Sequence, residues 1–261
     1  MNREQPLAIV TGGGTGIGRA LTAELVRHGL AVVIVGRREA PLQQTQADLA
    51  DLAGVSGSVE PLAADVATEA GRERIIAALG ERPVRLLVHN AALLEPVAPL
   101  AEVSLADWRQ HQAVNVEGPL FLTQALLDRL AGGRVLQISS GAAHHPYASW
   151  GAYCSSKAAL HMLYQVWREE LRERNVQVGS ARPGVVDTPM QAHIRTLDAK
   201  RFPHVERFRH LQANQMLVKP ADAARFLAWL LLATTDREFG AAEWDINECA
   251  ERWRAWEVPA A

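Results

Sequence analysis

The chain has 261 residues, of which 48% are hydrophobic and 21% are charged, and its formal net charge at pH 7 is −2. This composition is typical of a globular protein that buries a large core. The weak net charge excludes a broad basic surface for nucleic acid or an anionic membrane. The two cysteines, Cys154 and Cys249, form no disulfide framework, which favours a cytoplasmic location. We expect no secretory leader, and the apolar run Phe226–Ala233 is too short to span a bilayer.

Short apolar runs alternate along the chain with segments of helical periodicity. The runs predict strands at Leu7–Val10, Ala31–Val35, Ser58–Leu62, Val84–Val88, Arg134–Ile138, Val176–Ser180 and Ala242–Ile246. The segments between them predict helices at Gly18–His28, Leu42–Leu52, Thr68–Leu79, about Leu105–Leu130, about Gly151–Arg174 and Pro220–Leu232. Strands that alternate with helices form right-handed βαβ units. We therefore expect a Rossmann-type α/β fold, with a doubly wound, mostly parallel sheet of about seven strands between two helical layers.

No linker or internal repeat divides the chain, so we expect residues 1–261 to form a single dinucleotide-binding domain. The alternation breaks once, between about Pro189 and Val218, where a segment rich in charge and histidine follows a predicted strand. We interpret this segment as a partly helical substrate lid. A solvated pair of surface helices is the alternative interpretation.

A glycine-rich segment, Thr11–Gly18, joins the first predicted strand to the first predicted helix. Glycines at this point let the main chain approach a pyrophosphate, while the helix N-terminus faces its negative charge. Turns are rich in glycine in any protein, so the position within a βαβ unit carries the argument. The dinucleotide contacts predicted in this loop are Gly12, Gly14, Thr15, Gly16, Ile17 and Gly18.

The second predicted strand is followed by two arginines, Arg37 and Arg38, where NAD-binding sites place an acidic residue for the ribose 2′-hydroxyl. A guanidinium suits a 2′-phosphate in both charge and geometry, so the arginines favour NADP(H). A solvated arginine pair at a strand end is the alternative. Asp65, after the third strand, is placed to accept a hydrogen bond from the adenine amino group or to cap the next helix.

Tyr153 and Lys157 lie four residues apart on a predicted helix, which places both side chains on one face. A nearby ammonium lowers the pKa of a phenol, so the pair is a candidate general acid for a carbonyl oxygen. Ser140 follows a predicted strand at the edge where ligands bind in such sheets, although a turn or cap role is also open. Asn115, a poor helix former within a long predicted helix, suggests a buried polar task.

These motifs together resemble the classical short-chain dehydrogenase/reductase family along nearly the whole chain. The matching segments are Thr11–Gly18, Asp65-Val66, Asn90-Ala91-Ala92, Asn115, Ser140, Tyr153, Lys157 and Pro183–Thr188. Their order and separation are more specific than any one motif. One departure is Ala92, where the family usually has glycine; we expect it to narrow the space near the cofactor without abolishing binding.

The resemblance implies a role for each matching residue. Tyr153 would donate the proton, and Lys157 would bind the nicotinamide ribose and depress the tyrosine pKa. Ser140 would hydrogen-bond the substrate carbonyl, and Asn115 would anchor a water in a proton relay. The further cofactor contacts that the resemblance implies are Val66, Asn90, Ala91, Ala92, Pro183, Gly184, Val186, Thr188 and Met190.

A closer resemblance connects the chain with sepiapterin reductases and the related benzil reductases. It rests on the segments Trp150–Val166, Arg182–Gln191 and Gly240–Asp245. In sepiapterin reductases a C-terminal aspartate anchors the pterin, and Asp245 occupies the matching position. A surface aspartate at the end of the last strand is an equally open interpretation. The expected substrate contacts are Ser140, His145, Trp150, Tyr153 and Asp245, and no histidine or cysteine spacing suggests a metal site.

The sequence therefore predicts an NADPH-dependent reductase of a ketone or α-dicarbonyl, pterin-like or benzil-like. Two alternatives are an NAD(P)-dependent alcohol dehydrogenase of other specificity and a non-catalytic NADP(H) sensor. The family resemblance implies a homodimer or homotetramer, assembled through the predicted helices at about Leu105–Leu130 and Gly151–Arg174. We expect a small-molecule carbonyl substrate and neither nucleic acid nor membrane as partners.

Overall fold

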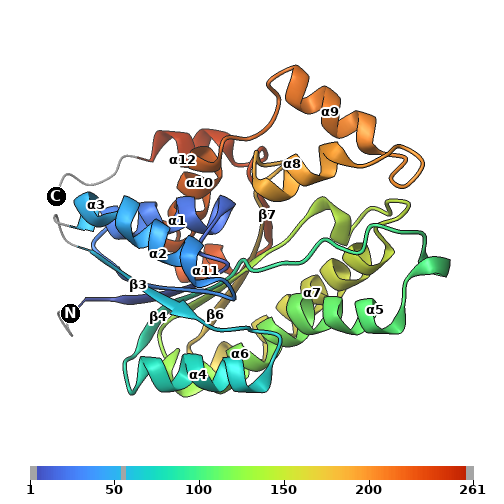
Figure 1. Cartoon of the computed structure of the whole chain (residues 1–261). Helices are drawn as coiled ribbons and strands as arrows, with labels where there is room; N and C mark the ends of the chain where they lie inside the picture. Colours follow the sequence, from blue (N-terminus) through green and yellow to red (C-terminus); the bar gives the residue numbers. More distant parts are fainter. Residues whose placement is uncertain (1–4, 54–56, 257–261) are drawn as a thin grey trace.

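The computed structural model describes residues 5–53 and 57–256, and its centre is a seven-stranded parallel sheet (Figure 1). The strands are β1 (Leu7–Thr11), β2 (Ala31–Gly36), β3 (Ser58–Ala63), β4 (Val84–His89), β5 (Arg134–Ile138), β6 (Gln177–Arg182) and β7 (Glu243–Asp245). Their order across the sheet is β3-β2-β1-β4-β5-β6-β7. The predicted doubly wound α/β fold is thus confirmed. Residues 1–4, where we expect no leader, and 257–261 lie outside the described residues.

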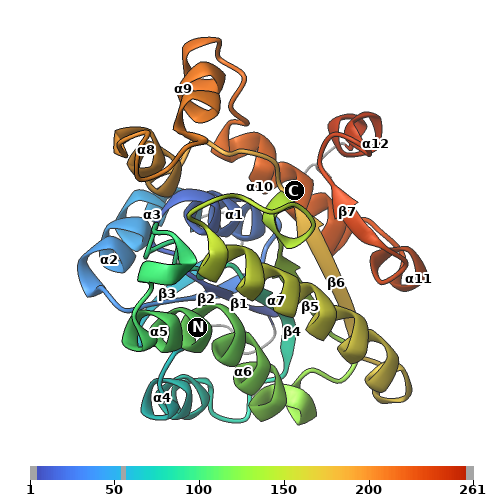
Figure 2. The same ribbon diagram turned by 90° about the vertical axis from the view of Figure 1, so that its right-hand side faces the viewer.

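Helices cover both faces of the sheet (Figure 1). One layer consists of α1 (Gly16–Arg27), α2 (Glu39–Asp48), α3 (Ala50–Ala53), α10 (Pro220–Leu232), α11 (Asp236–Phe239) and α12 (Ala250–Ala255). The other consists of α4 (Glu69–Leu79), α5 (Leu105–Gln112), α6 (Gly118–Leu126) and α7 (Gly151–Glu170), of which Figure 2 shows α5, α6 and α7 side by side. No helix in the described part of the chain has the length and apolarity that a membrane span requires.

Strands β1 to β6 contribute to two separate apolar cores, one on each face of the sheet. In β1, Ala8 and Val10 pack with α1 and α10, whereas Leu7 and Ile9 pack with α4, α6 and α7. Side chains alternate between the faces of a strand, and both faces are covered here, so β1 is apolar at successive positions. This double burial holds the carboxyl ends of the strands rigidly. From β1 the strand order runs outward to β2 and β3 on one side and to β4 and the later strands on the other, and this reversal of strand order creates the crevice where ligands bind in such folds.

The long helix predicted from about Leu105 to Leu130 is interrupted in the structure. Between α5 and α6 lies a π-helical segment, Ala113–Glu117, with Asn115 at its centre. Such single-turn insertions occur often at functional sites. The predicted helix at Leu42–Leu52 is likewise two helices, α2 and α3, and the final strand is only three residues long. Short 3₁₀ turns lie at Leu100–Glu102, Leu127–Arg129, Gly141–Ala143 and Arg172–Arg174.

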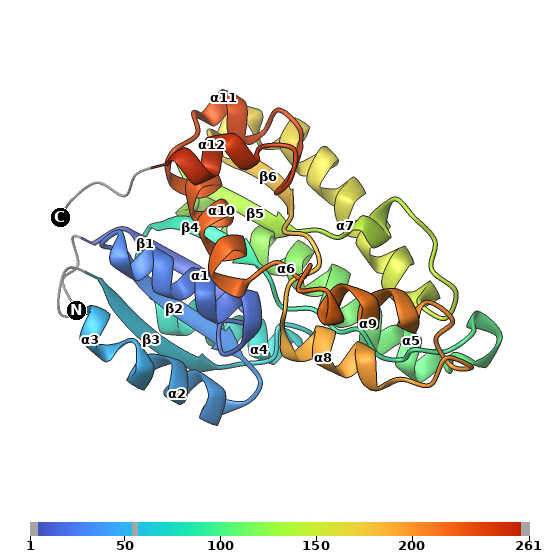
Figure 3. The same ribbon diagram turned by 90° about the horizontal axis from the view of Figure 1, so that it is seen from above.

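The segment predicted as a lid, 189–218, contains α8 (Pro189–Thr196) and α9 (Val205–Ala213). Figure 3 shows these two helices projecting together beyond the sheet. They are packed by a third apolar cluster, in which the ring of Trp150 is stacked on that of Phe202 with 4.7 Å between centroids. Val205 and Phe208 of α9 are also buried there. The segment is therefore anchored to the loop before α7 by its apolar face.

Candidate active site

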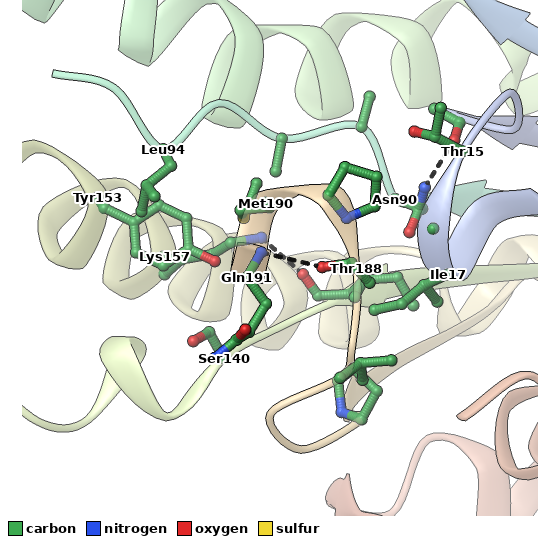
Figure 4. Close-up of a pocket in the computed structure, with 18 of the residues that line it drawn as sticks. Thr15, Ile17, Asn90, Leu94, Ser140, Tyr153, Lys157, Thr188, Met190 and Gln191 are labelled. Atoms are coloured by element: carbon green, nitrogen blue, oxygen red, sulfur yellow. Dashed lines mark hydrogen bonds between the residues drawn. The ribbon is translucent and has the colours of Figure 1, made fainter. Parts of the chain in front are cut away.

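A pocket of about 520 Å³ opens at the carboxyl ends of the central strands (Figure 4). Nearly all of the predicted site residues line it. They are Gly12, Gly14, Thr15, Gly16, Ile17, Arg37, Arg38, Asp65, Val66, Asn90, Ala91, Ala92, Ser140, His145, Trp150, Tyr153, Lys157, Pro183, Gly184, Val186, Thr188, Met190 and Asp245. Gly18 and Asn115 are the two predicted residues that do not line the pocket.

The glycine turn is tightly packed against Asn90. At Gly12 the backbone has φ +69°, and a Cβ there would lie 2.8 Å from Asn90 Nδ2. The same Nδ2 donates a 2.9 Å hydrogen bond to the main-chain oxygen of Thr11. A Cβ at Gly18 would lie 2.3 Å from the Gly12 oxygen, so Gly18 permits the turn to close on α1. Gly18 is thus required for packing beside the pocket, and the prediction that it contacts the dinucleotide stays a prediction.

The N-terminus of α1 has the features of an anion-binding site. Thr15 caps the helix with an extended backbone, but its hydroxyl makes no capping hydrogen bond, and no acidic residue occupies the first turn. Free main-chain N–H groups and the helix dipole therefore face the pocket with a hydroxyl beside them. Arg37 and Arg38, at the end of β2, are exposed and form no ion pair with any residue that the structure describes. A dinucleotide with several phosphates fits this donor set.

Tyr153 and Lys157 lie on the buried face of α7, as the spacing predicts. The Lys157 Nζ lies 5.7 Å from the centroid of the Tyr153 ring. Burial raises the pKa of Tyr153 to about 12, and a hydrogen bond with Ser140 opposes this shift. Burial also lowers the pKa of Lys157 to about 8. Desolvation of the phenol is thus the largest influence on the tyrosine pKa in this structure, and the prediction that Lys157 depresses that pKa stays a prediction.

Ser140 follows β5 and shapes the loop that leads to α7. Its Oγ accepts a 3.2 Å hydrogen bond from the main-chain nitrogen of Ala142 and caps the 3₁₀ turn Gly141–Ala143. This capping orients the hydroxyl, and the hydrogen bond with Tyr153 brings both side chains to the same point of the pocket. Two hydroxyl groups at one point can hydrogen-bond the same carbonyl oxygen.

Asn115 is buried behind the pocket and joins two elements that carry it. Its Oδ1 accepts a 2.7 Å hydrogen bond from the main-chain nitrogen of Leu93, and its Nδ2 donates to Ser156 Oγ at 3.0 Å. The amide therefore connects the loop after β4 to α7. Its partner on α7, Ser156, directly precedes Lys157. The polar role that we predicted for this buried residue is thus to hydrogen-bond the main chain of Leu93 and the side chain of Ser156 on α7. Its predicted role in anchoring a water stays a prediction.

Sequence analysis missed Glu243, the first residue of β7, whose side chain is only 8% exposed. Its carboxylate lies 2.6 Å from His144 Nε2 and 3.1 Å from His161 Nδ1, and it accepts a 2.9 Å hydrogen bond from Ser180 Oγ. Burial raises the pKa of Glu243, but hydrogen bonds with Ser139, His144 and Ser180 and the charge of His161 outweigh burial and hold it below its usual value.

The ligand atoms of His144, His161 and Glu243 all lie within 4.8 Å of one another, close enough to suggest a metal site. However, Arg182 Nε lies 3.2 Å from the same carboxylate. A guanidinium at that position already supplies the positive charge that a metal ion would bring. We therefore interpret the group as an ion-pair cluster. It joins β6, β7 and α7 to the loop that follows Ser140.

Asp245 lines the pocket and forms an ion pair with Arg182. Its Oδ2 lies 3.5 Å from Arg182 Nη2, and its Oδ1 accepts a 2.9 Å hydrogen bond from the main-chain nitrogen of Asn247. The same arginine also lies 3.5 Å from Glu248. Asp245 thus lines the pocket and is also an ion-pair partner at the end of the last strand.

The outer part of the pocket has apolar and aromatic walls. Tyr147, Trp150 and Phe208 line it, and the rings of Trp150 and Phe208 lie 5.4 Å apart. His145 lies on the exposed part of the same wall. Arg207, from α9, lines the pocket as well and donates a 3.1 Å hydrogen bond to Tyr147 Oη. The sequence pattern of α9 did not reveal Arg207, because only the fold brings it to Tyr147.

Comparisons with known proteins agree with this geometry. A family model described as short chain dehydrogenase matches residues 6–198. A benzil reductase ((S)-benzoin forming) from Bacillus subtilis is 34% identical over 242 residues, which cover 88% of this chain and 93% of that protein. A sepiapterin reductase from Mus musculus is 33% identical over 252 residues, which cover 88% and 92%.

A crystal structure of a metagenomic short-chain oxidoreductase in complex with NADP is also similar. Its TM-score is 0.71 at 26% identity, and the match covers 90% of this chain and 93% of that chain. The resemblance inferred from the motifs, including that to benzil and sepiapterin reductases, is confirmed by these matches. With its glycine turn, parallel sheet and extensive identity to these relatives, this chain is an oxidoreductase that belongs to the short-chain dehydrogenase family.

Proposed function

We propose that this protein is an NADPH-dependent carbonyl reductase acting on ketones or α-dicarbonyls. The observation that carries the proposal is one continuous pocket. It joins the glycine turn of α1 to the hydroxyls of Ser140 and Tyr153 and the ammonium of Lys157. A protein that only senses the dinucleotide has no need of these three groups together.

The residues of the pocket suit a nicotinamide dinucleotide. The N-terminus of α1 would hold its diphosphate, Asp65 would face the adenine, and Lys157 would bind the nicotinamide ribose. Val186 and Thr188 would hold the carboxamide, with Pro183, Gly184 and Met190 lining the same wall. When bound, the reduced cofactor would supply a hydride, that is, a proton together with two electrons, to the carbonyl carbon.

The side chains of this chain would manage the charge that forms on the carbonyl oxygen. Ser140 and Tyr153 would both donate hydrogen bonds to that oxygen, which receives the electron pair of the carbonyl π bond. The Tyr153 hydroxyl would then pass its proton to the oxygen, giving an alcohol. Because its pKa is raised to about 12, the phenol stays protonated at neutral pH, as a proton donor must. The buried Lys157 ammonium would stabilise the phenolate that remains.

The preference for NADP(H) is supported by Arg37 and Arg38. Their exposed guanidinium groups lie at the end of β2, beside the pocket, with no ion-pair partner among the described residues. A similar oxidoreductase was crystallised in complex with NADP. The aromatic outer wall, and relatives that are benzil and sepiapterin reductases, support a bulky carbonyl substrate. In this proposal Asp245, Trp150 and His145 contact that substrate.

The test is the consumption of NADPH with a panel of carbonyl compounds. The panel contains benzil, sepiapterin, simple diketones and steroid ketones, each measured with NADPH and with NADH. We expect turnover of at least one bulky ketone or diketone with NADPH. Binding of NADPH without turnover of any compound would favour the sensor. A strong preference for NADH would favour an alcohol dehydrogenase of other specificity.

We also propose that the whole chain acts as one domain, with α8 and α9 as its substrate lid, and that it forms a homodimer or homotetramer. Large apolar side chains on the outer surface of α6 and α7 support assembly. Phe121 is 39% exposed, Met162 is 57% exposed and Val166 is 43% exposed. Their burial between subunits would remove apolar surface from water.

A further inference from the structure

Gln191, near the start of α8, has a buried side-chain amide. Its side chain is part of a residue only 3% exposed, and it lines the pocket. Neither its Oε1 nor its Nε2 has a hydrogen-bond partner among the residues that the structure describes. Buried amides are nearly always hydrogen-bonded, so an exception beside a binding pocket indicates a partner that comes from outside the chain.

The main chain around Gln191 is held in place by a capped helix start. Thr188 caps α8, and its Oγ1 accepts a 3.3 Å hydrogen bond from the Gln191 nitrogen. Pro189 stands in the first turn of the helix, where its fixed φ suits a helix start. The amide therefore projects from a fixed anchor and cannot be explained as the end of a loose segment.

The direction of the side chain separates the substrate from the dinucleotide. In Figure 4 the Gln191 side chain extends on the Ser140 side of Thr188, whereas Thr15 and Ile17 lie on the opposite side. Ile194, one turn further along α8, belongs to the apolar cluster that also contains Tyr153. The amide is thus a polar group beside the apolar side chains that α8 contributes to the pocket, on the side where Ser140 lies.

We propose that the Gln191 amide binds a second polar group of the substrate, adjacent to the carbonyl that is reduced. This inference rests on the proposed reductase function and narrows its substrate class. An amide offers an N–H donor and a C=O acceptor, so it suits the second oxygen of an α-dicarbonyl or the N–C=O edge of a lactam. A substrate without such a group leaves the amide unpaired, and sites of this kind reject such analogues.

The experiment compares two ketones that differ by one oxygen, benzil and deoxybenzoin, in the wild type and in Gln191→Met. We expect kcat/KM for benzil to fall roughly 10- to 100-fold in the variant, while that for deoxybenzoin changes by less than about threefold. The Kd for NADPH should stay the same. Gln191→Leu, which removes the amide with a shorter, branched side chain, should show the same loss of preference.

Gln137, on β5, offers a matched control. It is 1% exposed, both of its amide atoms are also unpaired among the described residues, and it does not line the pocket. Gln137→Met should therefore leave the benzil to deoxybenzoin ratio unchanged. A wild type that reduces neither ketone nor any other compound of the panel contradicts the proposed function itself.

Two outcomes would overturn the inference while the reductase function stands. In the first, the wild type reduces benzil and Gln191→Met keeps the same ratio between the two ketones. In the second, the variant weakens NADPH binding and leaves that ratio unchanged, which would make the amide a cofactor contact. The inference is supported if Gln191→Met loses the preference for benzil over deoxybenzoin while its affinity for NADPH stays the same.

Discussion

The side-chain ammonium of Lys157 donates a 2.7 Å hydrogen bond to the main-chain oxygen of Ile138, the last residue of β5. This bond ties α7, which carries Tyr153, to the strand that leads to Ser140. The ammonium is buried, and burial lowers its pKa to about 8 from an ordinary value of 10.5. The position of Tyr153, the proposed acid, therefore depends on Lys157, whose charged form is disfavoured by burial.

The burial of Lys157 has a consequence for stability that can be measured. Its pKa is lower in the folded than in the unfolded chain, so protonation favours unfolding below about pH 8. This cost disappears as the pH rises from 8 towards 10.5. Relative to Lys157→Met, the wild type should gain about 2 to 3 kcal/mol of unfolding free energy between about pH 7 and about pH 10. A stability difference independent of pH in denaturant titrations would contradict this.

Replacement of Tyr153 by phenylalanine removes the proposed proton donor and keeps the ring. We expect kcat for carbonyl reduction to fall by roughly 10² to 10⁴, the usual contribution of a positioned general acid. NADPH affinity, measured by fluorescence, should change little. Tyr164→Phe is the matched control, because Tyr164 is buried on the same helix and does not line the pocket. Substantial turnover by Tyr153→Phe would rule out the proposed acid.

Arg37→Ala tests the choice of dinucleotide. Removal of a guanidinium from a 2′-phosphate should raise KM for NADPH roughly 10- to 100-fold, since a charged hydrogen bond contributes about 1.5–3 kcal/mol. KM for NADH, which lacks that phosphate, should stay nearly constant. Arg109→Ala, an exposed arginine on α5, should change neither value. Equal effects on both dinucleotides would show that Arg37 does not recognise the phosphate.

Contacts between neighbours in the chain were predictable, and contacts between distant segments were not. The Tyr153–Lys157 pair follows from helical spacing, and the glycine turn follows from its place between β1 and α1. Glu243 and His144 are 99 positions apart in the chain, so no local sequence pattern could predict their contact. The large effect of burial on the tyrosine pKa was not predictable for a related reason. Sequence spacing shows the nearby cation, whereas the cost of burying the phenol depends on how the whole fold packs around it.

The exposed apolar side chains on α7 give a test of assembly. Val166→Glu places a charge at a position that a subunit interface would bury, and burial of an unpaired charge is costly. We expect this variant to elute as a smaller species than the wild type in size-exclusion chromatography. Met216→Glu is a control, because Met216 is 60% exposed but lies beyond α9, far along the chain from α7. A wild type that is already monomeric contradicts the proposed oligomer.

Glu243 should support Ser140 by holding the loop that follows it. Glu243→Gln weakens the ion pairs of a buried carboxylate, so we expect a loss of about 1–3 kcal/mol at neutral pH and a lower kcat. The pKa of this carboxyl lies below its usual value, so its stabilising effect is present above about pH 4.5 and is lost as the pH falls. The wild type should therefore approach the stability of the variant in acid.

Glu248→Gln removes an exposed partner of Arg182 and should cost less than about 1 kcal/mol. If both variants lose equal stability, or if zinc rather than Arg182 proves to stabilise the cluster, the ion-pair interpretation is wrong.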